Sequence, residues 1–85
     1  METRIAAVSI IVENPEAAER LNNILHEYNS YVIGRLGVPY RQRGIYIICV
    51  VLDAPNEVIS ALSGKLGMLP NVTAKAVYSK PLPVK

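Results

Sequence analysis

Apolar positions along the chain follow two periodicities, which together predict four strands and two helices. Residues 4–12, 31–36, 45–52 and 72–79 are rich in isoleucine, valine and other strand-forming residues, and each segment predicts a β-strand. Between them, two groups of apolar residues recur every three or four positions, the spacing of one helical face. These groups are Ala17, Leu21, Ile24, Leu25 and Tyr28, and then Val58, Leu62, Leu66 and Leu69. The predicted order of elements is therefore β-α-β-β-α-β.

The two predicted helices begin in the same way. Residues 11–15 and 51–55 each run from apolar strand residues through an acidic residue and one further residue to a proline. Asn14 suits the N-cap position, and Pro15 suits the first turn because its missing N–H would have no partner there. Gly67 is a natural end for the second helix. This repetition indicates two βα units in tandem, each followed by a further strand, which is the split βαβ arrangement.

The fold class that follows is α+β. We predict a ferredoxin-like βαββαβ sandwich, with a four-stranded antiparallel sheet and two helices on one face. Right-handed crossovers place the first and third strands in the centre of the sheet. Both of these strands are apolar at odd and even positions alike, as strands buried on two faces are. The fourth strand is mixed, with Thr73, Lys75 and Ser79 at alternate positions, as expected for an edge.

We expect one domain, followed by a short tail. The ferredoxin-like domain covers residues 1–79, and within it residues 37–44 form the loop of a long hairpin. Residues 80–85 contain two prolines, which preclude a central strand. The tail is therefore an edge segment, an arm that crosses to another subunit, or disordered chain.

One face of the predicted sheet has no helix to cover it. That face exposes isoleucine, valine and Cys49, and exposed apolar patches of this kind usually mark an interface. A domain of 85 residues is also small, and small domains commonly need a disulfide, a metal or a partner subunit. With one cysteine and one histidine, His26, neither an internal disulfide nor a Cys/His zinc cluster can form. We therefore expect a homo-oligomer, a dimer or tetramer, joined through the open sheet face.

Charge is unevenly distributed along the chain. The net charge of +2 is too small to favour nucleic acid as a partner. Residues 1–27 hold five acidic residues against Arg4 and Arg20, residues 28–52 hold three arginines and no acid, and residues 58–85 hold four lysines and no acid. This pattern suits pairing between subunits or an anionic ligand, and it equally suits ordinary solvated faces. No signal peptide or membrane-spanning run is visible, so we expect a cytoplasmic protein.

Three short segments resemble binding motifs without completing them. Residues 43–50 begin like the third strand of an RNA-recognition module, but aliphatic residues occupy the positions where aromatic rings would stack on bases. Residues 34–41 resemble the phosphate loop of acylphosphatases, which share this topology, but they follow the first helix instead of preceding it. Residues 62–67 contain Gly-Lys, yet Ile59 stands where a P-loop has its first glycine.

Catalytic and metal-binding patterns are equally incomplete. The chain contains no paired carboxylates, no catalytic triad and no metal-ligand spacing. We interpret His26 as a boundary or interface residue beside the apolar face of the first helix. We interpret Cys49 as a small buried apolar residue. We therefore expect that the protein is not an enzyme, and we assign no catalytic residue and no metal ligand.

Three stretches together resemble a known small family. They are residues 35–41 (RLGVPYR), the uncharged strand 45–52, and residues 59–67 (ISALSGKLG) leading into 72–75 (VTAK). The segment LSGKLG, residues 62–67, is the most specific of them. On these residues the chain resembles the iron-only hydrogenase system regulators over nearly its whole length.

This resemblance implies a ferredoxin-like domain related to ACT domains and to the C-terminal sensing domain of nickel-responsive repressors. Those relatives assemble through sheets and helices and bind small effectors or metal at subunit interfaces. The nickel site does not carry over, because its set of histidine and cysteine ligands is absent here, and no cofactor is assigned. Since no ribbon-helix-helix segment precedes Arg4, we expect no direct binding to operator DNA.

Sequence and resemblance together favour a regulatory domain that senses a small ligand or contacts a partner protein, as in transcriptional control of a hydrogenase system. Arg35, Arg41 and Lys65 are the candidate ligands of a small anionic effector, since arginine offers carboxylates and phosphates a planar fork of donors. Gly37 and Gly64 would allow close approach of that effector. Two other hypotheses stay open, namely a small enzyme or electron-transfer accessory protein of this fold, and an accessory subunit of a larger complex.

Overall fold

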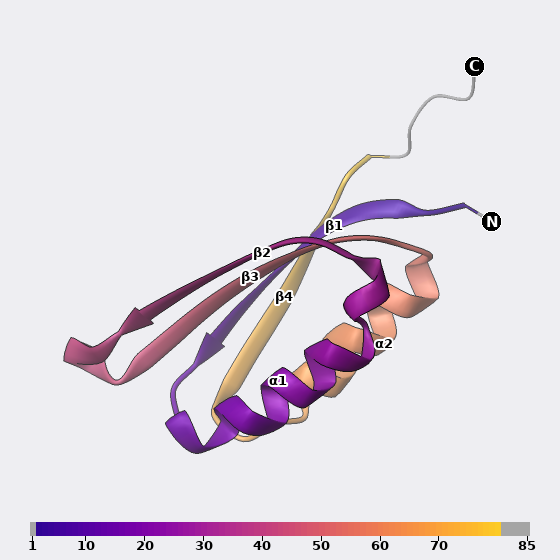
Figure 1. Cartoon of the computed structure of the whole chain (residues 1–85). Helices are drawn as coiled ribbons and strands as arrows, with labels where there is room; N and C mark the ends of the chain where they lie inside the picture. The colour runs from indigo at the N-terminus through magenta and orange to yellow at the C-terminus, as the bar shows by residue number, and fades with distance from the viewer. Residues whose placement is uncertain (1, 81–85) are drawn as a thin grey trace.

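The structure, a computed structural model, describes residues 2–80. Its helices and strands are β1 (Arg4–Val12), α1 (Ala18–Glu27), β2 (Val32–Tyr40), β3 (Ile45–Ala54), α2 (Asn56–Gly67) and β4 (Val72–Tyr78). The strands form one antiparallel sheet in the order β2-β3-β1-β4, with both helices on one face (Figure 1). The predicted ferredoxin-like α+β class is confirmed, as is the central position of the first and third strands. From residue 81 onward, the predicted tail lies outside the described residues.

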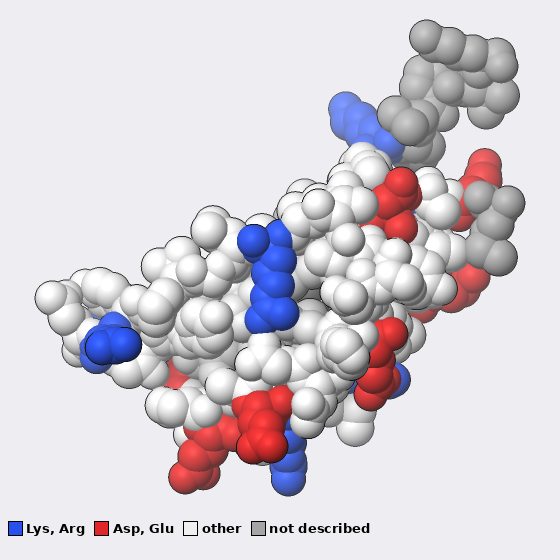
Figure 2. Space-filling view, viewed as in Figure 1, with Lys and Arg blue, Asp and Glu red and all other residues white. Residues whose placement is uncertain are grey.

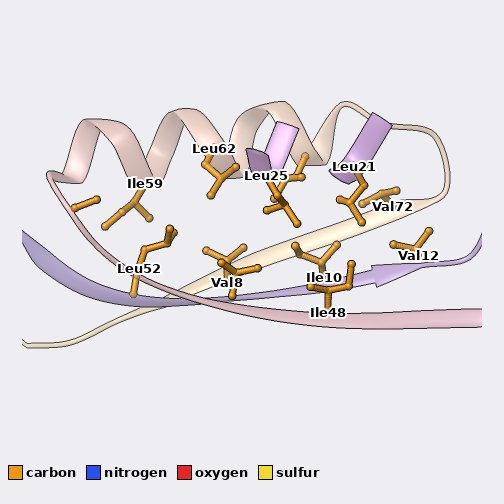
Figure 3. Packing of buried hydrophobic residues seen from close by; sticks show 14 of the residues in the cluster. Val8, Ile10, Val12, Leu21, Leu25, Ile48, Leu52, Ile59, Leu62 and Val72 are labelled. Carbon is orange, nitrogen blue, oxygen red and sulfur yellow. The ribbon is translucent and has the colours of Figure 1, made fainter. Parts of the chain in front are cut away.

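The core lies between the helices and the inner face of the sheet, where the labelled side chains of α1 and α2 point toward those of the strands (Figure 3). Every second residue of β1 and β3 enters this layer, because successive side chains of a strand point to opposite faces. Its strand residues are Ala6, Val8, Ile10, Val12, Ile48, Val50, Leu52, Ala54 and Val72. Its other members are Ala17, Leu21, Leu25, Ile59, Leu62 and Leu66. No buried polar or charged residue accompanies them among the described residues.

The apolar face of α2 is rotated relative to the predicted one. Ile59 is fully buried although it is missing from the predicted stripe, whereas Val58 and Leu69 pack only partly against the core. Val58 precedes Leu62 by four residues and Ile59 precedes it by three, so both spacings fit one helical face. Only packing against the sheet decides which of the two residues points inward.

The hairpin of β2 and β3 is longer than predicted. Residues 37–40 continue β2 instead of forming a loop, and only residues 41–44 make the turn. Pro39 is tolerated because β2 is an edge strand, and one side of an edge strand has no ladder partner that needs an N–H. Pro39 pairs in register with Tyr46 of β3. As a result, the hairpin projects beyond the helices (Figure 1), and the molecule is elongated, 48 × 20 × 17 Å.

Asn14 caps the segment that leads into α1, as predicted. Its side-chain oxygen Oδ1 accepts a hydrogen bond of 3.0 Å from the backbone N–H of Glu16. The chain then makes one 3₁₀ turn, Pro15–Ala17, before α1 begins at Ala18. This path brings Pro15 and Ala18 beside the β2–β3 hairpin, where both line a cavity.

Gly44 closes the hairpin turn in the left-handed backbone region, with φ of 63°. Gly44→Ala is expected to lower the free energy of unfolding by about 1–2 kcal/mol, because a Cβ atom disfavours that region. Gly64 offers a matched control, since it lies within α2 and an added Cβ would have no neighbour within 4 Å. Gly64→Ala is expected to raise the free energy of unfolding by about 1 kcal/mol. Urea denaturation measures both free energies of unfolding. A lower free energy of unfolding for both variants would contradict the expected difference between the two positions.

Candidate functional site

The sheet surface opposite the helices, which we call the open face, is strongly apolar. Seven of its large side chains are between 38% and 69% exposed, and they are Ile5, Ile11, Leu36, Val38, Tyr40, Ile47 and Val77. The only charged residues that the four strands place on this face are Lys75 and Asp53. The predicted exposure of isoleucine and valine is confirmed. Cys49 also lies on the open face, as expected, and it is half-buried there instead of fully buried.

Cross-strand register joins these side chains into a continuous surface. Ile47 of β3 lies opposite Val38 of β2 on one side and opposite Ile11 of β1 on the other, and Ile11 in turn lies opposite Thr73 of β4. Side chains placed directly opposite one another have Cβ atoms about 4.5–5.5 Å apart. Tyr40 extends the same face toward the end of the hairpin. The open face is therefore one apolar patch that runs from β4 to the hairpin, and β2 contributes much of it.

Arg35 points toward the helices. It pairs in register with the buried Val50, and its guanidinium Nη2 donates a hydrogen bond of 2.6 Å to Oδ1 of Asn22 on α1. Beside this contact lies a small cavity of about 120 Å³ with a largely polar wall. Its lining residues are Asn22, Leu25, His26, Asn29, Val32, Arg35 and Val50. His26 is exposed on α1, in keeping with the boundary position expected for it.

Arg41 lies in the hairpin turn and lines a different cavity, of about 270 Å³. This cavity, which we call the hairpin cavity, lies between the hairpin and the start of α1. Its lining residues are Val12, Pro15, Ala18, Pro39, Tyr40, Arg41, Gly44, Ile45 and Tyr46. Gly37 shapes it indirectly, because a Cβ at that position would lie 2.6 Å from the hydroxyl oxygen of Tyr46. The close approach predicted for Gly37 is therefore made by the Tyr46 ring.

Lys65 and Gly64 lie on α2, away from both cavities. The Lys65 Nζ donates a hydrogen bond of 3.0 Å to Oε2 of Glu27 on α1 and lies 5.2 Å from the centre of the Tyr28 ring. The hydrogen bond to Glu27 raises the pKa of Lys65 above its ordinary value, and the contact with Tyr28 acts in the same direction. Gly64 is exposed, and no described atom comes close to the position of its missing Cβ.

The five predicted ligand residues do not form one cluster within a subunit. Arg35 and Arg41 line separate cavities, and Lys65 lines neither of them. Gly37 and Arg41 come together at the hairpin cavity, through Tyr46. Sequence reasoning missed the apolar wall of that cavity because residues 37–40 were interpreted as loop. The alternation of Leu36, Val38 and Tyr40 was a signal that β2 continues through these residues, and this continuation brings Pro39 and Tyr40 to the cavity.

Acidic and basic side chains are interspersed on the visible surface. Figure 2 shows basic side chains at the end of the hairpin and in the middle of this face, and acidic side chains along the lower edge with a basic one beside them. Arg41 and Arg43 form the hairpin turn. Within residues 2–80, no group of three His, Cys, Asp or Glu side chains is placed to hold a metal ion. None of the helices described here has both the length and the apolar character needed to cross a membrane.

Comparisons with known proteins agree with this geometry. The family model described as "TM1266-like: Iron-only hydrogenase system regulator, putative" matches residues 4–76. The solved structure of protein TM1266 from Thermotoga maritima is 40% identical to this chain, with a TM-score of 0.88, and the match covers 93% of this chain and 100% of that one. No curated protein matches the chain. The range matched by the family model includes the hairpin and every residue predicted to bind a ligand.

Proposed function

Because the chain belongs to the family of iron-only hydrogenase system regulators, we propose that it is a regulatory binding module built from identical subunits. The subunits join through their open faces as a dimer or tetramer, and the assembly responds to a small anionic effector. The proposed role is binding, not catalysis, and its place is the cytoplasm. Any control of transcription passes through a partner protein, since a net charge of +2 attracts DNA only weakly.

The apolar open face is the observation that carries this proposal. Burying one valine, leucine or isoleucine side chain completely contributes about 1.5–3 kcal/mol. Seven large apolar side chains on this face are between 38% and 69% exposed, so covering them contributes on the order of several kcal/mol. A gain of that size matters for a domain of 85 residues, because small domains bury a low fraction of their surface and are only marginally stable alone.

A second copy of the same face is the binding partner that best fits the open face. In a twofold interface, the same patch of each subunit meets its counterpart, so the patch has to be complementary to itself. The open face meets this condition because it is apolar and carries one basic and one acidic residue, Lys75 and Asp53, with no net charge. Two copies therefore meet without net electrostatic repulsion.

The native mass of the purified protein tests the proposal. We expect light scattering over a wide range of protein concentration to give the mass of a dimer or tetramer, and native mass spectrometry to give whole multiples of the subunit mass. A bound effector would add a small extra mass to these species. A well-folded monomer at all concentrations would overturn the proposed assembly, and stable copurification of a different protein would favour an accessory subunit of a larger complex.

A further inference from the structure

We propose that the hairpin cavity binds a small organic acid, whose carboxylate contacts Arg41 and whose apolar body lies against Tyr46 and Pro39. This inference rests on the effector part of the proposed function and names the class of that effector. It does not depend on how many subunits assemble.

The wall of the hairpin cavity favours an apolar ligand. Of its nine lining residues, Arg41 is the only charged one, and the others are aliphatic, aromatic, proline or glycine residues. Small-molecule sites typically combine such an apolar wall with a few polar groups that fix the orientation of the ligand. The volume of about 270 Å³ is at the lower limit for drug-sized ligands. The cavity therefore suits a molecule of about the size of an amino acid.

The cavity is assembled from two distant segments and has a fixed ring in its wall. Val12, Pro15 and Ala18 contribute from the end of β1 and the start of α1, and the other six lining residues, 39–41 and 44–46, contribute from the hairpin. The Tyr46 ring passes over Gly37, in space that any larger residue at position 37 would occupy. This packing fixes where the ring lies and so gives the cavity a preformed apolar surface.

Arg41 is better placed to bind an anion than the other two candidate cations. Arg35 already donates a hydrogen bond to Asn22, and Lys65 is paired with Glu27. Within residues 2–80, no hydrogen bond or ion pair engages the Arg41 guanidinium. Its planar fork of donors can bind both oxygens of a carboxylate.

The charge of the site favours a monoanion. One guanidinium in an otherwise apolar cavity can balance one negative charge, whereas a doubly charged phosphate would leave an unpaired charge in apolar surroundings, which is costly. A monocarboxylate with an aliphatic or aromatic body is therefore the ligand class that fits.

The test uses 3-phenylpropanoate as the probe, with the neutral 3-phenylpropanamide and inorganic phosphate for comparison, titrated into the ¹⁵N-labelled protein. We expect the acid to cause saturable shifts of the amide signals of Ala18, Gly44 and Tyr46, and the other two probes to bind at least about tenfold more weakly. Arg41→Gln should weaken binding of the acid about tenfold or more, since it removes a charged hydrogen bond. Arg43→Gln is the matched control, because Arg43 lies in the same turn but does not line the cavity.

A second variant tests the apolar wall without changing the charge. Gly37→Ala should move the Tyr46 ring and weaken binding of the acid while Arg41 stays in place.

Equal effects of Arg41→Gln and Arg43→Gln on binding would overturn the inference. Equal affinity for the acid and the amide would also overturn it, as would the absence of a saturable shift at the cavity. The native mass of the same samples separates the two proposals. Saturable binding to a monomer would overturn only the assembly, and an intact assembly that binds none of the probes would overturn only this site.

Discussion

Ile47→Glu is expected to dissociate the assembly into folded monomers. Ile47 lies on a central strand, between Ile11 and Val38 of the open face, and is 39% exposed. A glutamate at this position would be buried in an apolar interface without a partner, which costs several kcal/mol for an ionised carboxylate. Because a twofold interface contains the substitution twice, the dissociation constant should rise by at least about a hundredfold.

The measurement is the native mass by light scattering, with circular dichroism to confirm that the subunit stays folded. Met68→Glu is the matched control, because Met68 is 84% exposed just after α2, outside the sheet. It introduces the same charge at an exposed apolar position away from the open face and should leave the mass unchanged. Equal masses for the two variants would exclude the open face as the interface.

Leu62→Ala is expected to cause the largest loss of stability of the substitutions considered. Leu62 is completely buried and points from α2 onto the sheet (Figure 3). Removing three carbon atoms from such a position loses their transfer free energy and leaves a cavity, so the free energy of unfolding should fall by about 2–5 kcal/mol. Since native proteins have only about 5–15 kcal/mol in total, this loss is a large fraction of the stability of the domain.

Urea denaturation at a fixed protein concentration measures this loss. Leu69→Ala is the matched control, because Leu69 undergoes the same chemical change but is only partly buried against the core. Its loss should be clearly smaller than that at Leu62. If the two losses were equal, α2 would not present Leu62 to the core as the structure describes.

The elements of the fold could be predicted because their signals are local. The strand over residues 4–12 was predicted with its observed bounds, and the capping role of Asn14 is borne out by its hydrogen bond to Glu16. Each of these signals lies within one element: the alternation of a strand, the N-cap of a helix and the proline that follows the cap. Such signals can be recognised from neighbouring residues alone. The order of the strands followed from these elements and from the handedness of their connections.

The candidate site could be predicted only in part. The sequence singled out Arg41 and Gly37, and the structure places Arg41 in the wall of the hairpin cavity and Gly37 next to the Tyr46 ring that lines it. It did not indicate that Arg35 contacts Asn22 or that Lys65 contacts Glu27, since these partners come from other elements. Contacts between separate elements depend on how those elements pack, which no local pattern records.

The sequence by itself determined that this protein has four strands, two helices and one sheet face without a helical cover. It also indicated that Cys49 lies on that uncovered face, although β3 is apolar on both sides. The packing of the helices places Ile48 in the core and leaves Cys49 half-buried on the open face. Tertiary structure also decided the length of the hairpin. Pro39 argues against a strand in a local reading, and its position on an edge of the sheet is what makes it acceptable. The hairpin cavity exists because residues 12–18 and 39–46, distant in sequence, meet only in the folded chain.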